Sequence, residues 1–410
     1  MKNLSLKERF FLVTLGVPSF GLSLVYTLVT TYLPYFIENL SNAAITGILV
    51  SAEGIFALTI PFLIGSWSDS ISTPIGKRLP FFFAGVLFMS FTLVMMPFSS
   101  DNLFLLWVEF ALFFISYFTI YEAYYALYPD VVSYEQRNRS QGILGGFRSF
   151  GMLLALVGGG FLIDVWKPLP FLLFTVILLI VTVVLYFGVR EKIRSKTSYE
   201  SIEWHGEWEL IRSNKKIQLW VAANTCWESA VSILRVFIVL YFTKGINLSL
   251  SQSSAALLLV GVPALFAAPL SGWLADKYGH RPIVLISTVC FAIGLLPPVF
   301  STNRHLIALI LPVAFAAVTL MTLPFSMLMG FLPKKKRHGA GAALFGFCQG
   351  IGVLVGPLVA GLSIHALRSV NFLVFSETHG FTAMYVLSSA FLFLSIPFSL
   401  ALFKEQKKGH

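Results

Sequence analysis

Long apolar runs, separated by short polar or turn-rich segments, form the dominant pattern along the 410 residues. About 20 consecutive apolar residues suffice for an α-helix to cross the hydrocarbon core of a bilayer, and backbone groups in lipid must be hydrogen-bonded within the protein. The pattern therefore predicts an all-α membrane protein with twelve transmembrane helices. We expect these helices at residues 10–37, 43–66, 79–99, 102–128, 140–164, 169–189, 217–243, 251–275, 281–301, 304–331, 338–367 and 379–403.

The composition and the placement of charge agree with a membrane-embedded chain. Only 12% of residues are charged, whereas soluble proteins contain about 25%. The net charge of +10 would suit a nucleic-acid partner, but the basic residues gather in alternate loops, so we expect no nucleic acid to bind. With both termini in the cytoplasm, 23 of the 29 Lys and Arg residues lie in inside loops and tails. The positive-inside rule then predicts a multi-pass protein of the cell membrane with cytoplasmic termini.

The one long polar connection divides six helices from six. It predicts an N-terminal six-helix bundle at residues 1–190, a cytoplasmic linker at 191–216 and a C-terminal six-helix bundle at 217–410. Hydrophobic linker residues recur near helical spacing, which suits either an interfacial helix or a solvated linker. They are Ile202, Trp204, Trp208 and Ile211.

A glycine–acid–base motif follows the second helix of each half. Its glycines allow the backbone to turn tightly, and its acid lies one helical turn after the first glycine. The first copy comprises Gly65, Asp69, Gly76, Lys77 and Arg78, and the second comprises Gly272, Asp276, Lys277, Gly279 and Arg281. The motif resembles the signature loop of the major facilitator superfamily, and the hydrophobic rhythm matches over nearly the whole chain. The resemblance implies two pseudo-symmetric bundles, a cavity lined by the first, fourth, seventh and tenth helices, and gating at these loops.

A weaker resemblance concerns the solute. Ser68-Asp69 with Gly76-Lys77-Arg78, and the segment 126–130 that closes the fourth helix, are similar to patterns in sugar–cation symporters of the sucrose and glycoside–pentoside–hexuronide types. Cation-binding members of the latter group carry acids shortly before the glycine loop, whereas residues 57–64 contain none. The resemblance thus implies a sugar or a similar polar organic solute and disfavours sodium coupling.

Several ionisable residues fall inside predicted helices. Each costs about 2.5–3.5 kcal/mol at mid-membrane unless it is paired or hydrated, so it should face the bundle interior or a water-filled cavity. Glu122 and Arg148 each lie about 12–14 Å into the membrane on adjacent helices, and we expect an ion pair between them that is either structural or linked to transport. The proton-coupling candidates are Glu122, Arg148, Glu228, Arg235 and Glu53.

The seventh helix carries a polar stripe on an otherwise apolar surface. Asn224, Glu228, Ser232 and Arg235 follow at steps of four, four and three residues, and we expect this stripe to line the cavity. Glu228 and Arg235 are about 10 Å apart along the helix axis, which implies a bridging ligand, a water or a residue of another helix.

Tyrosines of the fourth helix and hydroxyl residues of the first and tenth helices are further cavity candidates. Tyrosine suits a partly wet cavity, although aromatic packing explains the same pattern. Serine and threonine hydroxyls either reach a solute or bond back to their own helix. Together with the stripe, the substrate-cavity candidates are Ser23, Thr27, Tyr117, Tyr121, Tyr124, Asn224, Ser232 and Thr322.

The sequence contains no pattern typical of an enzyme. It has no metalloprotease, nucleotide-binding or serine-hydrolase motif, and Cys226, Cys290 and Cys348 lack metal-site spacing, so we expect no cofactor or metal. Without a nucleotide motif, energy must come from gradients. We predict a secondary active transporter, functional as a monomer, that moves a small organic solute with H+. A proton-driven exporter of apolar or amphiphilic compounds and a non-transporting membrane sensor of the same fold are the alternatives.

Overall fold

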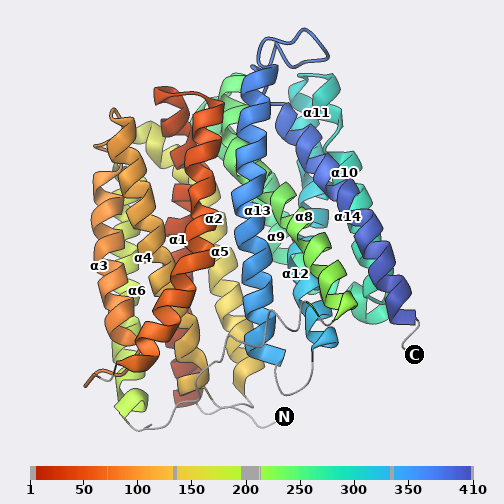
Figure 1. Cartoon of the computed structure of the whole chain (residues 1–410). Helices are drawn as coiled ribbons and strands as arrows, with labels where there is room; N and C mark the ends of the chain where they lie inside the picture. Colours follow the sequence, from red (N-terminus) through yellow and green to blue (C-terminus); the bar gives the residue numbers. More distant parts are fainter. Residues whose placement is uncertain are drawn as a thin grey trace. The chain divides into compact units, whose positions relative to one another are not determined.

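The computed structural model describes residues 6–71, 73–132, 136–194, 212, 214–332 and 337–407. All regular elements in these ranges are helices (Figure 1). The first half contains α1 (Leu6–Leu40), α2 (Ala43–Ser70), α3 (Leu79–Met95), α4 (Leu103–Val131), α5 (Arg137–Val165) and α6 (Leu169–Arg194). The second half contains α8 (Lys215–Leu240), η3 (Tyr241–Gly245), α9 (Leu250–Tyr278), α10 (His280–Gly294), α11 (Pro297–Phe300), η4 (Arg304–Leu309), α12 (Ile310–Phe331), α13 (Arg337–Leu367) and α14 (Ala383–Lys407).

Each of the twelve predicted hydrophobic segments is helical. Among the described residues, eleven helices are long and apolar enough to cross a membrane. The remaining segment, α3, has 17 residues, about 26 Å of helix, which is the lower limit for a span. It ends before the predicted residue 99 because Pro97 has no backbone N–H to continue the helical hydrogen bonding, although Met96 before it keeps helical backbone angles.

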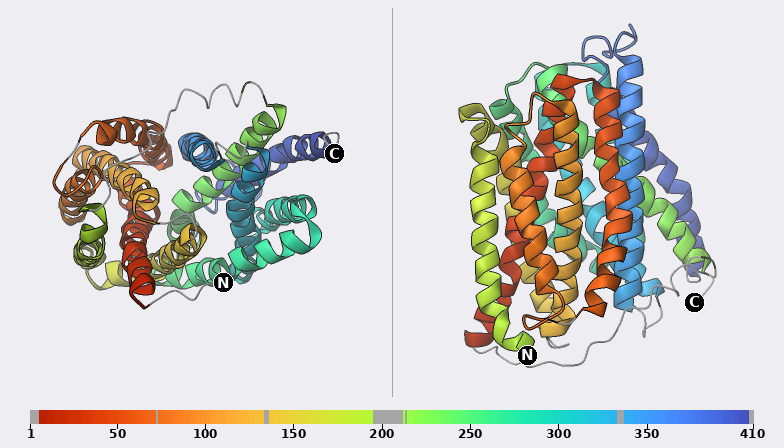
Figure 2. Two further views of the ribbon diagram at one scale, coloured as in Figure 1. Left: turned by 90° about the horizontal axis from the view of Figure 1, so that it is seen from below. Right: turned by 60° about the vertical axis from the view of Figure 1, so that its left-hand side comes forward.

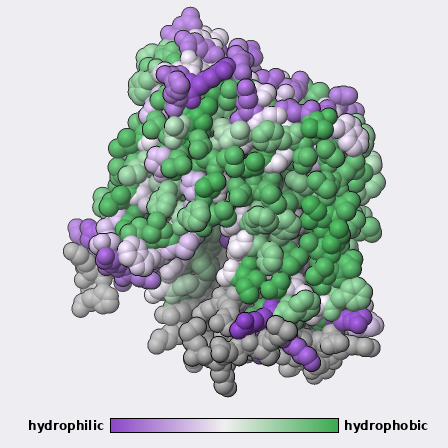
Figure 3. Space-filling view, turned by 180° about the vertical axis from the view of Figure 1, so that it is seen from behind, coloured by the Kyte–Doolittle hydropathy of each residue, from purple (hydrophilic) through white to green (hydrophobic). Residues whose placement is uncertain are grey.

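Large hydrophobic side chains are exposed on many helices, as expected for surfaces that contact lipid. Phe104 is 74% exposed and Phe10 is 69% exposed. Figure 3 shows one face on which hydrophobic residues cover most of the described surface, while hydrophilic residues gather toward its upper and lower margins. So much exposed apolar surface would be unstable in water, and the chain is a multi-pass membrane protein.

The chain forms two compact units. The first comprises Met1–Leu33 and Thr59–Ser201, and the second comprises Pro34–Leu58 and Ile202–His410. Helices α1 and α2 therefore each contribute to both units. The change of unit falls at Pro34 in α1 and three residues before Pro61 in α2. The predicted linker falls largely on residues outside the described ranges, and so does its possible interfacial helix.

In the first unit, α1 packs between α4 and α5 (Figure 2). The Tyr124 hydroxyl of α4 donates to the Leu15 carbonyl of α1 at 2.5 Å. On the other side of α1, the Tyr32 hydroxyl donates to the Leu156 carbonyl of α5 at 2.5 Å. These contacts fix the rotation of α4 and α5 about α1.

In the second unit, α13 packs closely against both α2 and α8 through glycines. A Cβ atom at Gly47 of α2 would lie 2.9 Å from Cα of Gly361, and one at Gly352 would lie 2.8 Å from the Ser229 amide nitrogen of α8. Small residues allow such close approach of helix backbones. The first part of α2 is thereby held near α8.

Candidate functional site

An ion pair joins α2 and α8 within the second unit. The Arg235 Nη2 atom lies 3.1 Å from Oε1 and 3.0 Å from Oε2 of Glu53. The Glu53 side chain is 1% exposed and that of Arg235 is 21% exposed. Another helix thus supplies a partner for Arg235, one of the three possibilities that the stripe implied.

A second carboxyl group lies close to this pair. Glu228 is buried on α8, two helical turns before Arg235, and interacts with it electrostatically. The backbone of Glu228 is in close contact with Gly352 of α13. Arg235 is thus the ion-pair partner of Glu53 and also interacts electrostatically with Glu228.

The rest of the polar stripe is buried, and Glu228 and Ser232 pack against α13. Asn224 is fully buried, and the Ser232 hydroxyl donates to the Gly352 carbonyl at 2.9 Å. Gly352 of α13 has no side chain to shield its backbone carbonyl, so the Ser232 hydroxyl of α8 reaches this group. Of the stripe, Arg235 retains the most exposure, and Asn224, Glu228 and Ser232 are buried. Their lining of a transport cavity stays a prediction.

In the first unit, Arg148 of α5 lies against tyrosines of α4. It interacts electrostatically with Tyr117, Tyr121 and Tyr125 and shares a hydrogen bond with Tyr125. The rings of Tyr121 and Tyr125 are 4.3 Å apart, and Tyr26 of α1 stacks on Tyr117 at 4.6 Å. We call Tyr26, Tyr117, Tyr121 and Tyr125 the tyrosine cluster. These four side chains are half-buried, and Arg148 is exposed.

The ion pair predicted between Glu122 and Arg148 is not formed. Glu122 lies beside α2, where a Cβ atom at Gly65 would be 3.4 Å from its Oε1 atom. One residue turns an α-helix by about 100°, so Glu122 points away from the face that carries Tyr117, Tyr121 and Tyr125.

The predicted cavity tyrosines Tyr117, Tyr121 and Tyr124 divide between two faces of α4. Tyr124 and Tyr128 both donate to the Leu15 carbonyl of α1, at 2.5 and 3.2 Å, and both are buried. Tyr125 belongs to the cluster instead, although we did not select it from the sequence. The spacing of four residues from Tyr117 to Tyr121 to Tyr125 is the signal that would have found it.

The remaining hydroxyl candidates are engaged in helix contacts. Ser23 is buried beside Gly151 and donates to the Phe20 carbonyl at 3.0 Å, and Thr27 is buried. The half-buried Thr322 of α12 shares a hydrogen bond of 3.2 Å with Ser271 of α9.

The signature loops contain the tight turns that their glycines predict. Gly76 has φ +94° and Gly279 has φ +83°, a region that favours glycine. Gly65 and Gly272 instead lie inside α2 and α9, so they do not form the turns.

The charged residues of the loops contact aromatic and hydroxyl groups. Arg78 is buried and donates to the Ser68 hydroxyl, and Lys77 is half-buried. The Lys277 ammonium lies 5.2 Å from the ring centroids of both Trp273 and Tyr278. Arg281 lies 5.9 Å from the Phe403 ring, Asp276 is exposed, and the Asp69 side chain is outside the description.

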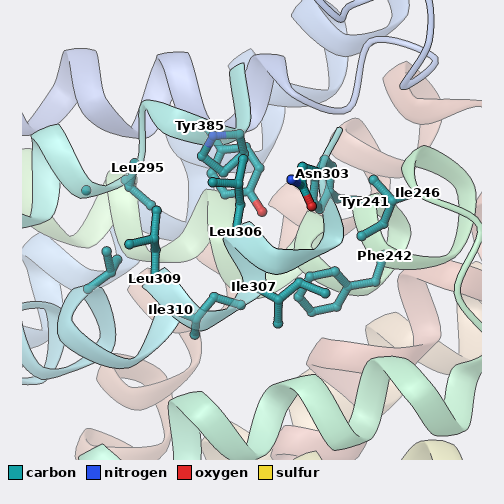
Figure 4. A pocket seen from close by; sticks show the side chains of 13 residues that line it. Tyr241, Phe242, Ile246, Leu295, Asn303, Leu306, Ile307, Leu309, Ile310 and Tyr385 are labelled. Atoms are coloured by element: carbon teal, nitrogen blue, oxygen red, sulfur yellow. The ribbon is translucent and has the colours of Figure 1, made fainter. Parts of the chain in front are cut away.

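A small pocket lies at the end of the second unit that carries η3 and η4 (Figure 4). Its wall is mostly apolar, with polar atoms from Tyr241, Tyr385 and Asn303 and no charged side chain. None of the predicted site residues lines it. Within the described ranges, no group of three or more His, Cys, Asp or Glu side chains is arranged to hold a metal ion.

Comparisons with known proteins place this geometry in context. The family described as MFS/sugar transport protein matches over residues 14–405. The chain is 23% identical over 266 residues to a proline/betaine transporter of Escherichia coli, covering 57% of the chain and 51% of that protein. It is 22% identical to an uncharacterized MFS-type transporter, YcxA, of Bacillus subtilis, covering 60% of the chain and 58% of that protein. The chain thus spans about half the length of the curated relatives that it matches.

Solved transporter structures share the fold. A bacterial homologue of the human lysosomal transporter Spinster, in an inward-facing and unoccupied conformation, matches with a TM-score of 0.77 and 15% identity, covering 98% of both chains. The nucleoside transporter NupG matches with a TM-score of 0.75 and 15% identity, covering 96% of this chain and 99% of that chain. At this level of identity the likeness establishes the fold alone.

Proposed function

Because the chain belongs to the MFS/sugar transport protein family and is a membrane transporter, we propose that it moves a small organic solute together with protons by alternating access. The observation that carries this proposal is the buried Glu53–Arg235 pair between α2 and α8, with Glu228 close by. A transporter that uses a proton gradient needs a carboxyl group whose protonation changes the contacts between helices.

Protonation of Glu53 would change these contacts directly. Removing one charge of a buried ion pair leaves the other uncompensated, at a cost of about 3–5 kcal/mol. Arg235 would then turn toward Glu228, and α2 would lose its polar attachment to α8. Residues 43–58 of α2 group with the second unit and residues 59–70 with the first, so this attachment is well placed to control movement between the access states.

One proton is sufficient to drive useful accumulation. A proton moving down a gradient of one pH unit releases about 1.4 kcal/mol, which corresponds to about tenfold accumulation of solute. The family description supports a sugar or related polar solute, whereas the names of the proline/betaine relatives support a small charged one. We place the protein in the cell membrane with cytoplasmic termini, on the distribution of its basic residues, and take the monomer as the functional form.

The test uses purified full-length protein in liposomes that contain a pH-sensitive dye. A panel of sugars, amino acids and organic acids is screened for solute-dependent proton movement, which we expect for at least one class. Glu53→Gln should abolish proton movement with that solute while solute exchange persists. Glu405→Gln is the matched control, because Glu405 pairs with the exposed Lys215 at 3.6 Å.

Two results would contradict the proposal. The first is solute transport by the wild-type protein without proton movement. The second is undiminished proton movement in the Glu53→Gln variant.

A further inference from the structure

Arg148 is a charged residue inside a helical unit whose partners are phenol groups. No carboxylate pairs with it among the residues that the structure describes, and its recorded neighbours are Tyr117, Tyr121 and Tyr125. Glu122, the acid that we expected to pair with Arg148, lies beside α2. An arginine at membrane depth is normally compensated by an acid or by water in a cavity.

From this arrangement we infer that Arg148 and the tyrosine cluster bind the carboxylate group of the transported solute. This inference rests on the proposed transport function and names the class of solute. The Arg148 guanidinium, which lies among the tyrosine hydroxyls, offers a planar pair of donors that matches a carboxylate. The neighbouring tyrosine hydroxyls add donors that can reach the same group.

The charge of the cluster limits the charge of the solute. The proposed site consists of the tyrosine cluster and Arg148, which is its single cationic side chain. One negative charge on the solute therefore neutralises the site. A phosphate dianion would leave excess negative charge in a low-dielectric setting, which is costly. The solute is therefore a monocarboxylate.

The tyrosine rings set the character of the rest of the solute. Tyr26 stacks on Tyr117, and Tyr117 continues to Tyr121 at 6.0 Å between centroids. This half-buried aromatic surface accommodates a compact body by stacking on its flat or apolar faces, and an ammonium group by cation–π attraction. All of these solutes share the carboxylate. The probes described below distinguish sugar-like, aromatic and ammonium-bearing solutes.

Binding of matched probe pairs to the purified wild-type protein tests the inference directly. The pairs are glucuronate with glucose, benzoate with benzyl alcohol, and β-alanine with 3-aminopropanol, each measured by isothermal titration at pH 7. We expect the carboxylate member of at least one pair to bind about 10- to 100-fold more tightly than its uncharged partner, as a charge-assisted hydrogen bond allows. Equal affinities within every pair would overturn the inference, and this comparison requires no variant.

Variants locate the site. Arg148→Gln should remove the preference for the carboxylate member, and Arg148→Lys should restore part of it. Arg190→Gln removes the same charge at the exposed end of α6 and should leave the preference unchanged. A folded Arg148→Gln variant, with a normal elution profile, that keeps the full preference would contradict the assignment.

The outcomes for binding and for transport are distinguishable. Carboxylate-selective binding without flux would overturn the proposed function and keep the site. Proton-coupled flux of an uncharged solute, without selective binding of carboxylates, would keep the function and overturn the site.

Discussion

Arg235 pairs with the buried Glu53 and also interacts electrostatically with the buried Glu228, so its charge helps both carboxylates to be tolerated inside the second unit. The Glu53 side chain is 1% exposed, so the loss of its partner leaves a charge that water cannot reach. Buried pairs differ in this respect from exposed ones, which contribute about 0–1 kcal/mol.

We therefore predict that Arg235→Gln destabilises the protein by about 3–5 kcal/mol, seen as a lower midpoint in thermal unfolding. Adding Glu53→Gln should recover much of this loss, because two neutral amides need no counter-charge. Glu405→Gln, at the exposed pair with Lys215, should change stability by less than about 1 kcal/mol. A double variant no more stable than Arg235→Gln alone would argue against a dominant Glu53–Arg235 pair.

Sequence reasoning found the charged residues of the site but not all of their partners. The depth of a residue along a helix follows from a rise of about 1.5 Å per residue. For this reason we placed Glu122 and Arg148 at the same depth and expected them to form an ion pair. Rotation about the helix axis depends on packing, here the contacts of Tyr124 and Tyr32 with α1 and α5. Nothing in the sequence around Glu53 indicates that it meets Arg235, 182 positions away.

At the scale of elements, the glycines of α13 control how closely it approaches α8. A Cβ atom at Gly352 would lie 2.8 Å from the Ser229 nitrogen, whereas one at Gly142 of α5 has nothing within 4 Å. The two positions form a matched pair for the same substitution.

Gly352→Ala should cost about 1–3 kcal/mol, because overpacking forces the backbones apart. Gly142→Ala should be neutral or stabilising by up to about 1 kcal/mol, since alanine is the better helix former. Thermal unfolding of both variants is the measurement. Equal effects at the two sites would contradict the close contact between α13 and α8.

Helices α1 and α2 change unit at or near a proline. Pro61 cannot donate a backbone hydrogen bond to the preceding turn of α2, so the helix is weakened close to the boundary between Leu58 and Thr59. We predict that Pro61→Ala stiffens α2 and slows transport severalfold while solute binding stays within twofold. Parallel measurements of flux and of equilibrium binding check this, and an unchanged turnover rate would exclude α2 bending as a controlling motion.

The helical segments themselves were predicted well, because the length of each apolar run in the sequence gives the length of the helix directly. Positions where a helix is interrupted or changes from α-helical to π-helical geometry were harder to predict. The predicted helix 281–301 is divided into α10 and α11 around Leu295 and Leu296, before two prolines, and the seventh helix ends in the π-helical turn Tyr241–Gly245.

At the scale of the whole molecule, the two proposals combine into one prediction about voltage. A monocarboxylate anion that moves with one proton carries no net charge across the membrane, whereas a zwitterionic monocarboxylate such as β-alanine carries one positive charge with its proton. Uptake of an anion should therefore follow the pH gradient and respond little to membrane potential, set with potassium and valinomycin. An uptake rate that rises steeply with a negative interior would indicate a zwitterionic or uncharged solute, or more than one coupled proton.

The most direct test of the central claim is accumulation of solute in liposomes under a gradient of one pH unit at zero membrane potential. For the wild-type protein we predict about tenfold accumulation at steady state. For Glu53→Gln we predict equal solute concentrations inside and outside, reached by exchange that is still active. Tenfold accumulation by the Glu53→Gln variant would contradict the account.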